Sequence, residues 1–126
     1  MPHALVVDDE PTIRSTLGRF FVREGWEVTA CADADEALTL IERPDRPAFD
    51  LVLCDARLPG LSGAEFHGVL VQRDPTLAGR LVIITGDPFG AAVSAPNAPL
   101  LPVLEKPFEF EALRRLMRQR SGEASS

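Results

Sequence analysis

The sequence has few cysteines and histidines and no long hydrophobic run. Its two cysteines, Cys31 and Cys54, each end an apolar run and form no CxxC pair, which speaks against a disulfide framework or a zinc site. Neither of the two histidines, His3 and His67, has a second histidine at ligand spacing. No apolar stretch approaches the roughly 18 residues of a membrane span, and the first residues lack the basic and apolar segments of a signal peptide. We therefore expect a cytoplasmic protein that does not engage a membrane.

Basic residues are outnumbered by acidic ones. Lysine and arginine number 13 against 19 aspartates and glutamates, which gives a net charge of −6. This excess of negative charge argues against a domain that binds nucleic acid through its phosphates. The 126 residues, 45% of them hydrophobic, suffice for one domain whose single core needs neither disulfides nor a structural metal.

Apolar stretches of strand length alternate with helix-like stretches along the chain. Five strands are predicted, over residues 4–7, 26–31, 51–54, 81–85 and 102–105. Between them apolar residues recur at helical spacing, and two capping signatures, Asp33 with Glu36 and Ser62 with Glu65, predict where helices begin. This repeated alternation predicts an α/β fold, in which helices cover both faces of a parallel sheet.

The pattern weakens between residues 86 and 101. Prolines recur there, so at most a short helix around 89–95 is predicted. A last helix follows the fifth strand, and residues 121–126 read as a polar tail. We therefore assign residues 1–120 to the domain, and expect no DNA-binding or enzymatic domain to follow it in this chain.

Polar residues follow four of the predicted strands. Ligand sites of parallel sheets lie at the carboxyl ends of the strands. The residues found there are Asp8, Asp9, Glu10, Asp55, Thr85 and Lys106. Carboxylate oxygens are ligands of the kind that Mg²⁺ takes, commonly with waters and a phosphoryl oxygen. A hydroxyl and an ammonium are suited to hold the remaining oxygens of a phosphoryl group.

Each of these residues also has an ordinary explanation when it is taken alone. A pair of aspartates is commonly a solvated turn, Asp55 could cap the turn at Pro59 and Gly60, and a lysine before a proline is usually a surface residue. Four separate strand ends with complementary groups make coincidence a poor explanation. We therefore treat them as one candidate site.

The stretches VVDDEP, LVLCDARLPGLSG, VIITG and LEKPF resemble the response-regulator receiver domain of bacterial two-component systems. The resemblance covers about residues 3–118. It implies a flavodoxin-like, doubly wound sheet of five parallel strands in the order 2-1-3-4-5. It also implies that the protein accepts a phosphoryl group from a histidine kinase or a histidine phosphotransfer protein, with Mg²⁺ as cofactor.

The resemblance assigns a role to each site residue. Asp55 would be the phosphoacceptor, and Asp9 would bind Mg²⁺ directly. Asp8 would act on the metal largely through water, and the backbone carbonyl of Arg57 would be a further ligand. The phosphoryl oxygens would contact Thr85 and Lys106. The acid next to the pair, Glu10, would only flank the site.

The sequence departs from the family pattern on one side of the predicted pocket. The family's aromatic switch position, three residues before Lys106, is Val103, and the segment of the family's fourth helix is interrupted by prolines. We therefore expect signalling by another route, with residues 86–101 forming a mobile loop or a shortened helix. An ion pair of Arg57 with Asp87 across the mouth of the site is a further hypothesis, in which the pair gates water.

The predicted function is that of a signalling module and not of an enzyme. The receiver could stand alone, serve as a phosphate shuttle or sink, or be the terminal receiver of a hybrid kinase, and a homodimer is possible. One alternative is a small Mg²⁺-dependent phosphatase that turns over an aspartyl phosphate. Such haloacid-dehalogenase-like enzymes place an aspartate two residues after the nucleophile, where this chain has Arg57. Another is a phosphate-independent docking domain, which the complete set of site residues disfavours.

Overall fold

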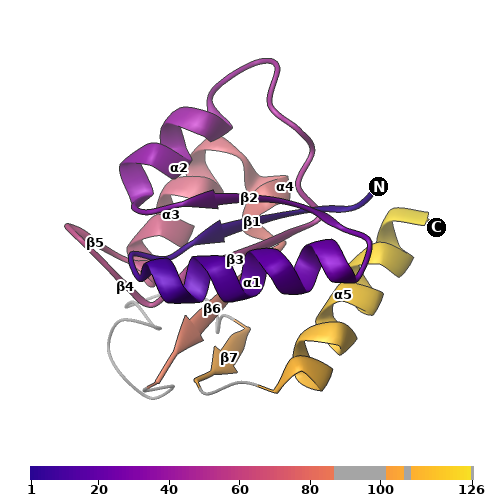
Figure 1. The fold of residues 1–126 in the computed structure, drawn as a ribbon. Helices are drawn as coiled ribbons and strands as arrows, with labels where there is room; N and C mark the ends of the chain where they lie inside the picture. The colour runs from indigo at the N-terminus through magenta and orange to yellow at the C-terminus, as the bar shows by residue number, and fades with distance from the viewer. Residues whose placement is uncertain (87–101, 107–108, 126) are drawn as a thin grey trace.

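The structure is a computed structural model that describes residues 1–86, 102–106 and 109–125 (Figure 1). Its main sheet has five strands in the order β2-β1-β3-β6-β7, and every neighbouring pair is parallel. The strands are β1 (His3–Val7), β2 (Glu27–Cys31), β3 (Leu51–Asp55), β6 (Leu81–Thr85) and β7 (Val103–Glu105). The predicted parallel sheet and its order 2-1-3-4-5 are therefore confirmed.

Helices lie on both faces of this sheet (Figure 1). They are α1 (Pro11–Arg23), α2 (Ala34–Ile41), α3 (Gly63–Arg73), α4 (Pro75–Ala78) and α5 (Phe110–Ser125). Alternate residues of β1 belong to different cores: Leu5 packs with α2, α3 and α4, whereas Val6 packs with α1 and α5. Burial on both faces explains why the central strands are continuous apolar runs in the sequence.

The helix starts predicted from capping signatures are present. Asp33 accepts a hydrogen bond from the amide of Glu36 at 2.8 Å, at the start of α2. At the start of α3, the Ser62 hydroxyl accepts from the amide of Glu65, and the Glu65 carboxylate accepts from the amide of Ser62. These local bonds satisfy amides that a helix leaves unpaired at its first turn.

Three features differ from the sequence-based expectation. The turn after β3 is flanked by a small antiparallel hairpin, β4 (Arg57–Leu58) with β5 (Leu61–Ser62). The extra helix α4 forms because Asp74 caps it and Pro75 is suited to its first position. The last helix continues to Ser125, into the segment predicted as a polar tail.

Several predictions concern residues beyond those that the structure describes. They are the loop or short helix within 87–101 and the partner of Arg57 at Asp87. Among the described residues, no helix combines the length and the apolar character that crossing a membrane requires.

Candidate functional site

Three aspartates come together at the carboxyl edge of the sheet. Asp8 and Asp9 directly follow β1, and Asp55 ends the neighbouring strand β3. One carboxylate oxygen from each residue lies within 4.8 Å of the other two. The side chains differ in exposure, because Asp8 is fully buried, Asp55 is 8% exposed and Asp9 is exposed. The parallel register therefore joins residues that are 47 positions apart in the sequence.

Lys106 brings a positive charge to these acids. Its Nζ lies 3.5 Å from Oδ2 of Asp8 and 3.7 Å from Oδ2 of Asp55. The Lys106 amide donates to the carbonyl of Thr85 at 2.6 Å, which ties the end of β7 to the end of β6. Thr85 is itself buried, at 5% exposure. All four strand ends that the sequence singled out thus lie along one edge of the sheet.

Backbone amides orient two of the carboxylates. The amide of Glu10 donates to Oδ1 of Asp8 at 2.8 Å, and the amide of Arg57 donates to Oδ1 of Asp55 at 3.2 Å. Each aspartate therefore has its Oδ1 held by the chain that follows it, while its Oδ2 faces Lys106. The backbone of Glu10 takes part in the site, although its side chain was expected only to flank it.

Arg14 is a contributor that the sequence analysis missed. Its guanidinium donates to the backbone carbonyl of Asp8 at 2.7 Å and so fixes the turn between β1 and α1. The signal for it was an arginine in the second turn of a helix that begins directly after an acidic run. The same signal is common on exposed helices, and only the structure shows where the side chain lies.

Burial and neighbouring charges act in opposite directions on Asp55. Burial raises the pKa of its carboxyl above the ordinary value, and the negative charges of Asp8 and Asp9 raise it further. The amide of Arg57 and the ammonium of Lys106 favour the ionised form and lower it. The net direction is upward, so Lys106 and the Arg57 amide do not offset burial together with the two neighbouring negative charges.

One carboxylate oxygen of the cluster lacks a hydrogen bond within the described part of the chain, so the donor set can be tested for its fit to a cation. Oδ2 of Asp8 is buried and has no hydrogen-bond partner among the described residues, while its distance to Lys106 exceeds that of a normal hydrogen bond. A buried carboxylate oxygen left in this state is costly. The all-oxygen donor set of the three aspartates fits Mg²⁺ better than it fits a softer metal.

The two cysteines take no part in this cluster. Both are buried free thiols. Burial raises the pKa of Cys31 to about 11, and it raises that of Cys54, beside the acids, above its usual range. Thiols held in the neutral form are poor metal ligands and poor nucleophiles, so the cysteines serve packing.

The fold defines the class of protein, a doubly wound α/β domain with a polar cluster at the carboxyl edge of its sheet. A sequence model of the response regulator receiver domain matches residues 4–118. The chain therefore belongs to the response regulator receiver domain family.

Curated relatives agree with this assignment. The response regulator protein PilR of Pseudomonas aeruginosa is 34% identical over 114 residues, which are 90% of this chain and 25% of PilR. The probable transcriptional regulatory protein TcrX of Mycobacterium tuberculosis is 31% identical over 91% of this chain and 49% of its own length. The chain thus spans only a quarter to a half of these two relatives.

Solved receiver structures share the fold. The signal receiver domain of an HD domain-containing protein from Pseudomonas fluorescens superimposes with a TM-score of 0.83 at 26% identity, covering 97% of this chain and 95% of that one. The response regulator TrrA of Thermotoga maritima, solved in complex with Mg²⁺ and beryllofluoride, gives a TM-score of 0.76 at 28% identity, with coverage of 95% and 99%.

Proposed function

We propose that this receiver accepts a phosphoryl group on Asp55 from a phosphohistidine donor, with Mg²⁺ bound, and passes the signal on by protein contact in the cytoplasm. The donor would be a histidine kinase or a histidine phosphotransfer protein. The observation that carries the proposal is the cluster itself, in which Lys106 and an unpaired oxygen of Asp8 face the Asp55 carboxylate. The family assignment supports the same role for the domain.

Each site residue would have its own role in phosphoryl transfer. A magnesium ion held by Asp8, Asp9, Asp55 and the carbonyl of Arg57 would supply positive charge to the attacking carboxylate and to the phosphoryl oxygens. Lys106 supplies a second positive charge next to Oδ2 of Asp55. The Thr85 hydroxyl is suited to contact another phosphoryl oxygen.

The covalent step is a simple exchange of bonds. An oxygen of the ionised Asp55 carboxylate forms a bond to phosphorus as the phosphorus–nitrogen bond of the donor histidine breaks. The electron pair of that bond stays on the imidazole nitrogen, which then takes a proton from solvent. Lys106 and the Arg57 amide favour the ionised carboxylate that this step needs, against the effect of burial.

A mass measurement tests the proposal. After incubation with Mg²⁺ and acetyl phosphate, we expect the intact protein to gain one phosphoryl group, and EDTA to prevent the gain. Asp55→Asn should gain none, whereas Asp45→Asn, which changes an exposed aspartate away from the site, should behave like the wild type. A phosphoryl group that still appears on Asp55→Asn would contradict the assignment.

Two further measurements separate this function from the alternatives. Mg²⁺ with beryllofluoride should raise the melting temperature of the wild type and leave that of Asp55→Asn unchanged; no shift in either would favour a phosphate-independent docking domain. Sustained turnover of phosphate monoesters would favour the phosphatase. We expect none, because position 57 carries an exposed arginine and no acid.

A further inference from the structure

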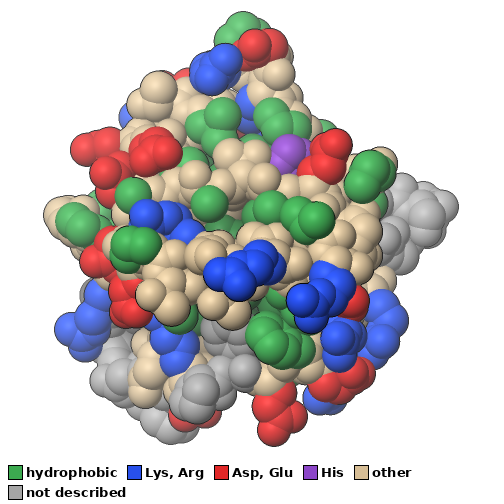
Figure 2. All heavy atoms as spheres, in the orientation of Figure 1, with side chains coloured by type: hydrophobic (Ala, Val, Ile, Leu, Met, Phe, Trp, Pro, Cys, Tyr) green, Lys and Arg blue, Asp and Glu red, His purple; other side chains and the backbone are tan. Residues whose placement is uncertain are grey.

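The outer face of α1 is basic in a protein that is acidic overall. The helix carries three arginines and no acid, although the whole chain has a net charge of −6. Arg14 donates to the backbone carbonyl of Asp8, but Arg19 and Arg23 lie nearer the end of the helix. In Figure 2, blue Lys and Arg side chains lie across this face beside green hydrophobic ones.

Two arginines of the neighbouring helix, Arg114 and Arg118, have acidic partners within the domain. Arg114 on α5 contacts Glu24 at 2.8 Å and lies over the ring of Phe20, 5.4 Å from its centroid. Arg118 contacts Glu111 at 3.1 Å. The acids Glu24 and Glu111 are therefore engaged by α5 and not by the arginines of α1.

Arg19 and Arg23 have no acidic partner among the described residues. Arg19 donates only to the hydroxyl of Ser15, at 3.0 Å. The two residues are four positions apart on one helix, where like charges repel each other. This arrangement costs stability within the domain, and an external anion would offset that cost.

Two hollows flank this pair of arginines, and both arginines line each hollow. The first, of about 580 Å³, is lined also by Gly18, Val22 and Val28. Val22 is 63% exposed, and a Cβ added at Gly18 would meet nothing within 4 Å, so this hollow has room for a side chain.

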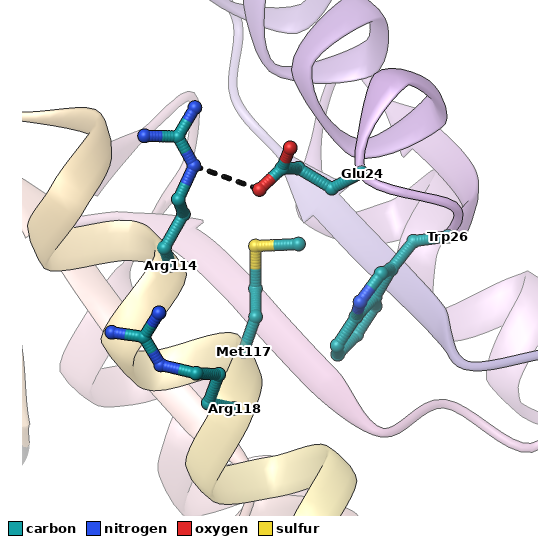
Figure 3. A pocket seen from close by; sticks show the side chains of 5 residues that line it. All are labelled: Glu24, Trp26, Arg114, Met117 and Arg118. Atoms are coloured by element: carbon teal, nitrogen blue, oxygen red, sulfur yellow. Dashed lines mark hydrogen bonds and ion pairs between the residues drawn. The ribbon is translucent and has the colours of Figure 1, made fainter.

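The second hollow, of about 210 Å³, lies between α1 and α5. It is lined by Thr16, Arg114 and the stacked rings of Phe20 and Phe110, whose centroids are 4.7 Å apart. Phe110 is 43% exposed. A smaller hollow further along α5, shown in Figure 3, has Trp26 and Met117 beneath the Arg114 to Glu24 pair. Apolar side chains therefore lie next to Arg19 and Arg23 in both hollows.

We propose that this arginine ridge, defined as Arg19 and Arg23 with the two hollows beside them, docks an acidic helical segment of a partner protein. Carboxylates spaced one turn apart on that segment would pair with Arg19 and Arg23, and guanidinium binds carboxylate with two parallel hydrogen bonds. Apolar side chains beside the carboxylates would enter the hollows. The ridge lies on the half of α1 away from Asp8, so docking does not require phosphoryl transfer.

The charge pattern favours this occupant over two others. Nucleic acid would gain few phosphate contacts from two unpaired arginines and would be repelled by the acidic remainder of the chain. A symmetric dimer through the ridge would place arginine against arginine. A protein segment with both carboxylates and apolar side chains matches the two features that the surface offers.

A peptide titration on isotope-labelled protein tests the docking. The probe is a synthetic, capped helical peptide of ~15 residues with glutamates at i and i+4 and leucines on either side of them. We expect its binding to shift the amide resonances of Gly18–Arg23 and of the first turns of α5. A matched peptide with glutamine in place of glutamate should bind about tenfold more weakly or not at all.

Two sets of variants, each with a matched control, identify the contacts. Arg19→Glu and Arg23→Glu should each weaken binding about tenfold, whereas Arg43→Glu, the same change of charge at an exposed site after α2, should leave it within about twofold. Gly18→Met should fill the larger hollow and block binding. Gly68→Met, at an exposed glycine of α3 with equal room, should not.

The outcomes decide the proposal clearly. The proposal is overturned if the acidic peptide does not bind, or if the glutamate and glutamine peptides bind equally well. It is also overturned if the amide resonances shift only on other surfaces, or if a single-stranded oligonucleotide binds more strongly than the peptide. Concentration-dependent dimerisation that Arg19→Glu enhances would point to a second copy and overturn it as well. The acidic peptide should still bind to Asp55→Asn. A failure of the docking proposal can therefore be distinguished from a failure of the proposed phosphoryl-acceptor role.

Discussion

The ammonium of Lys106 lies 3.5 Å from Oδ2 of Asp8, an oxygen that is buried and has no hydrogen bond among the described residues. Lys106 follows β7 and Asp8 follows β1, so the contact spans β3 and β6 between them. The same lysine is 3.7 Å from Asp55. Removing this cation leaves two adjacent buried carboxylates with their backbone hydrogen bonds but without the positive charge that lies beside them.

The first prediction concerns this lysine. Lys106→Met should lower the free energy of unfolding in metal-free buffer at neutral pH by ~1–3 kcal/mol, because it leaves buried carboxylates unpaired. The same change should cost less in an Asp8→Asn background, where one of those charges is gone. Denaturant titration of the four members of this double-mutant cycle measures the coupling. If Lys106→Met lowers the free energy of unfolding equally in the wild type and in Asp8→Asn, the contact between Lys106 and Asp8 does not contribute to stability.

The second prediction concerns Gly63, the first residue of α3. A Cβ built at this position would lie 2.9 Å from the carbonyl oxygen of Asp55 and 2.7 Å from Cδ1 of Ile83. Gly63 also donates its amide to the carbonyl of Ala56 at 2.7 Å, so the helix start sits against the chain that carries Asp55. Gly63→Ala should therefore destabilise the protein by ~1–3 kcal/mol and slow phosphoryl acceptance.

Gly68 provides the matched control in the same helix. A Cβ there would meet nothing within 4 Å, so Gly68→Ala should stabilise the protein by ~0.5–1 kcal/mol through helix propensity. Thermal denaturation and the mass assay report both effects. If the two alanine variants behave alike, the close approach of α3 to Asp55 is not a constraint.

Much of this architecture could be predicted because its signals are local or continuous in the sequence. Strands buried on both faces are unbroken apolar runs, and the caps at Asp33 and Ser62 depend on residues three positions away. The meeting of Asp8, Asp9 and Asp55 followed from one rule about the carboxyl ends of parallel strands.

The features that could not be predicted depend on contacts between residues that are far apart in the sequence. The need for glycine at position 63 arises from Asp55 and Ile83 on two different strands. The bond of Arg14 to the Asp8 carbonyl requires the turn that brings α1 back over β1. Very short elements such as α4 and the β4–β5 hairpin carry too few residues for a periodic pattern.

The third prediction concerns Arg46, which holds the loop between α2 and β3. Its guanidinium contacts Asp74 at 2.5 Å, and it also donates to the carbonyls of Ile41 and Pro47. Only 21% of its side chain is exposed. Arg46→Ala should cost ~1–3 kcal/mol of unfolding free energy, since it removes several bonds and leaves carbonyls unpaired. Arg43→Ala, at a well-exposed neighbour, should change stability by less than ~0.5 kcal/mol. Equal effects in denaturant titration would contradict this role.

The fourth prediction concerns His67, which lies on α3 and is 8% exposed. Burial lowers the pKa of its imidazole below the ordinary value of about 6.5. Just below that ordinary value the unfolded chain holds more protons at this position than the folded protein does. The free energy of unfolding should therefore fall as the pH is lowered from about 6.5 towards the folded pKa.

The variant His67→Gln isolates this effect, because it keeps a polar side chain that does not titrate. The raised pKa of Asp55 acts with the opposite sign, since the folded protein then holds the extra proton, but it is present in both proteins and cancels in the comparison. Denaturant titrations in EDTA between pH 7.5 and about 5 should show the wild type losing more stability than His67→Gln. Parallel curves over that range would show that the imidazole is solvated enough to accept a proton in the folded protein.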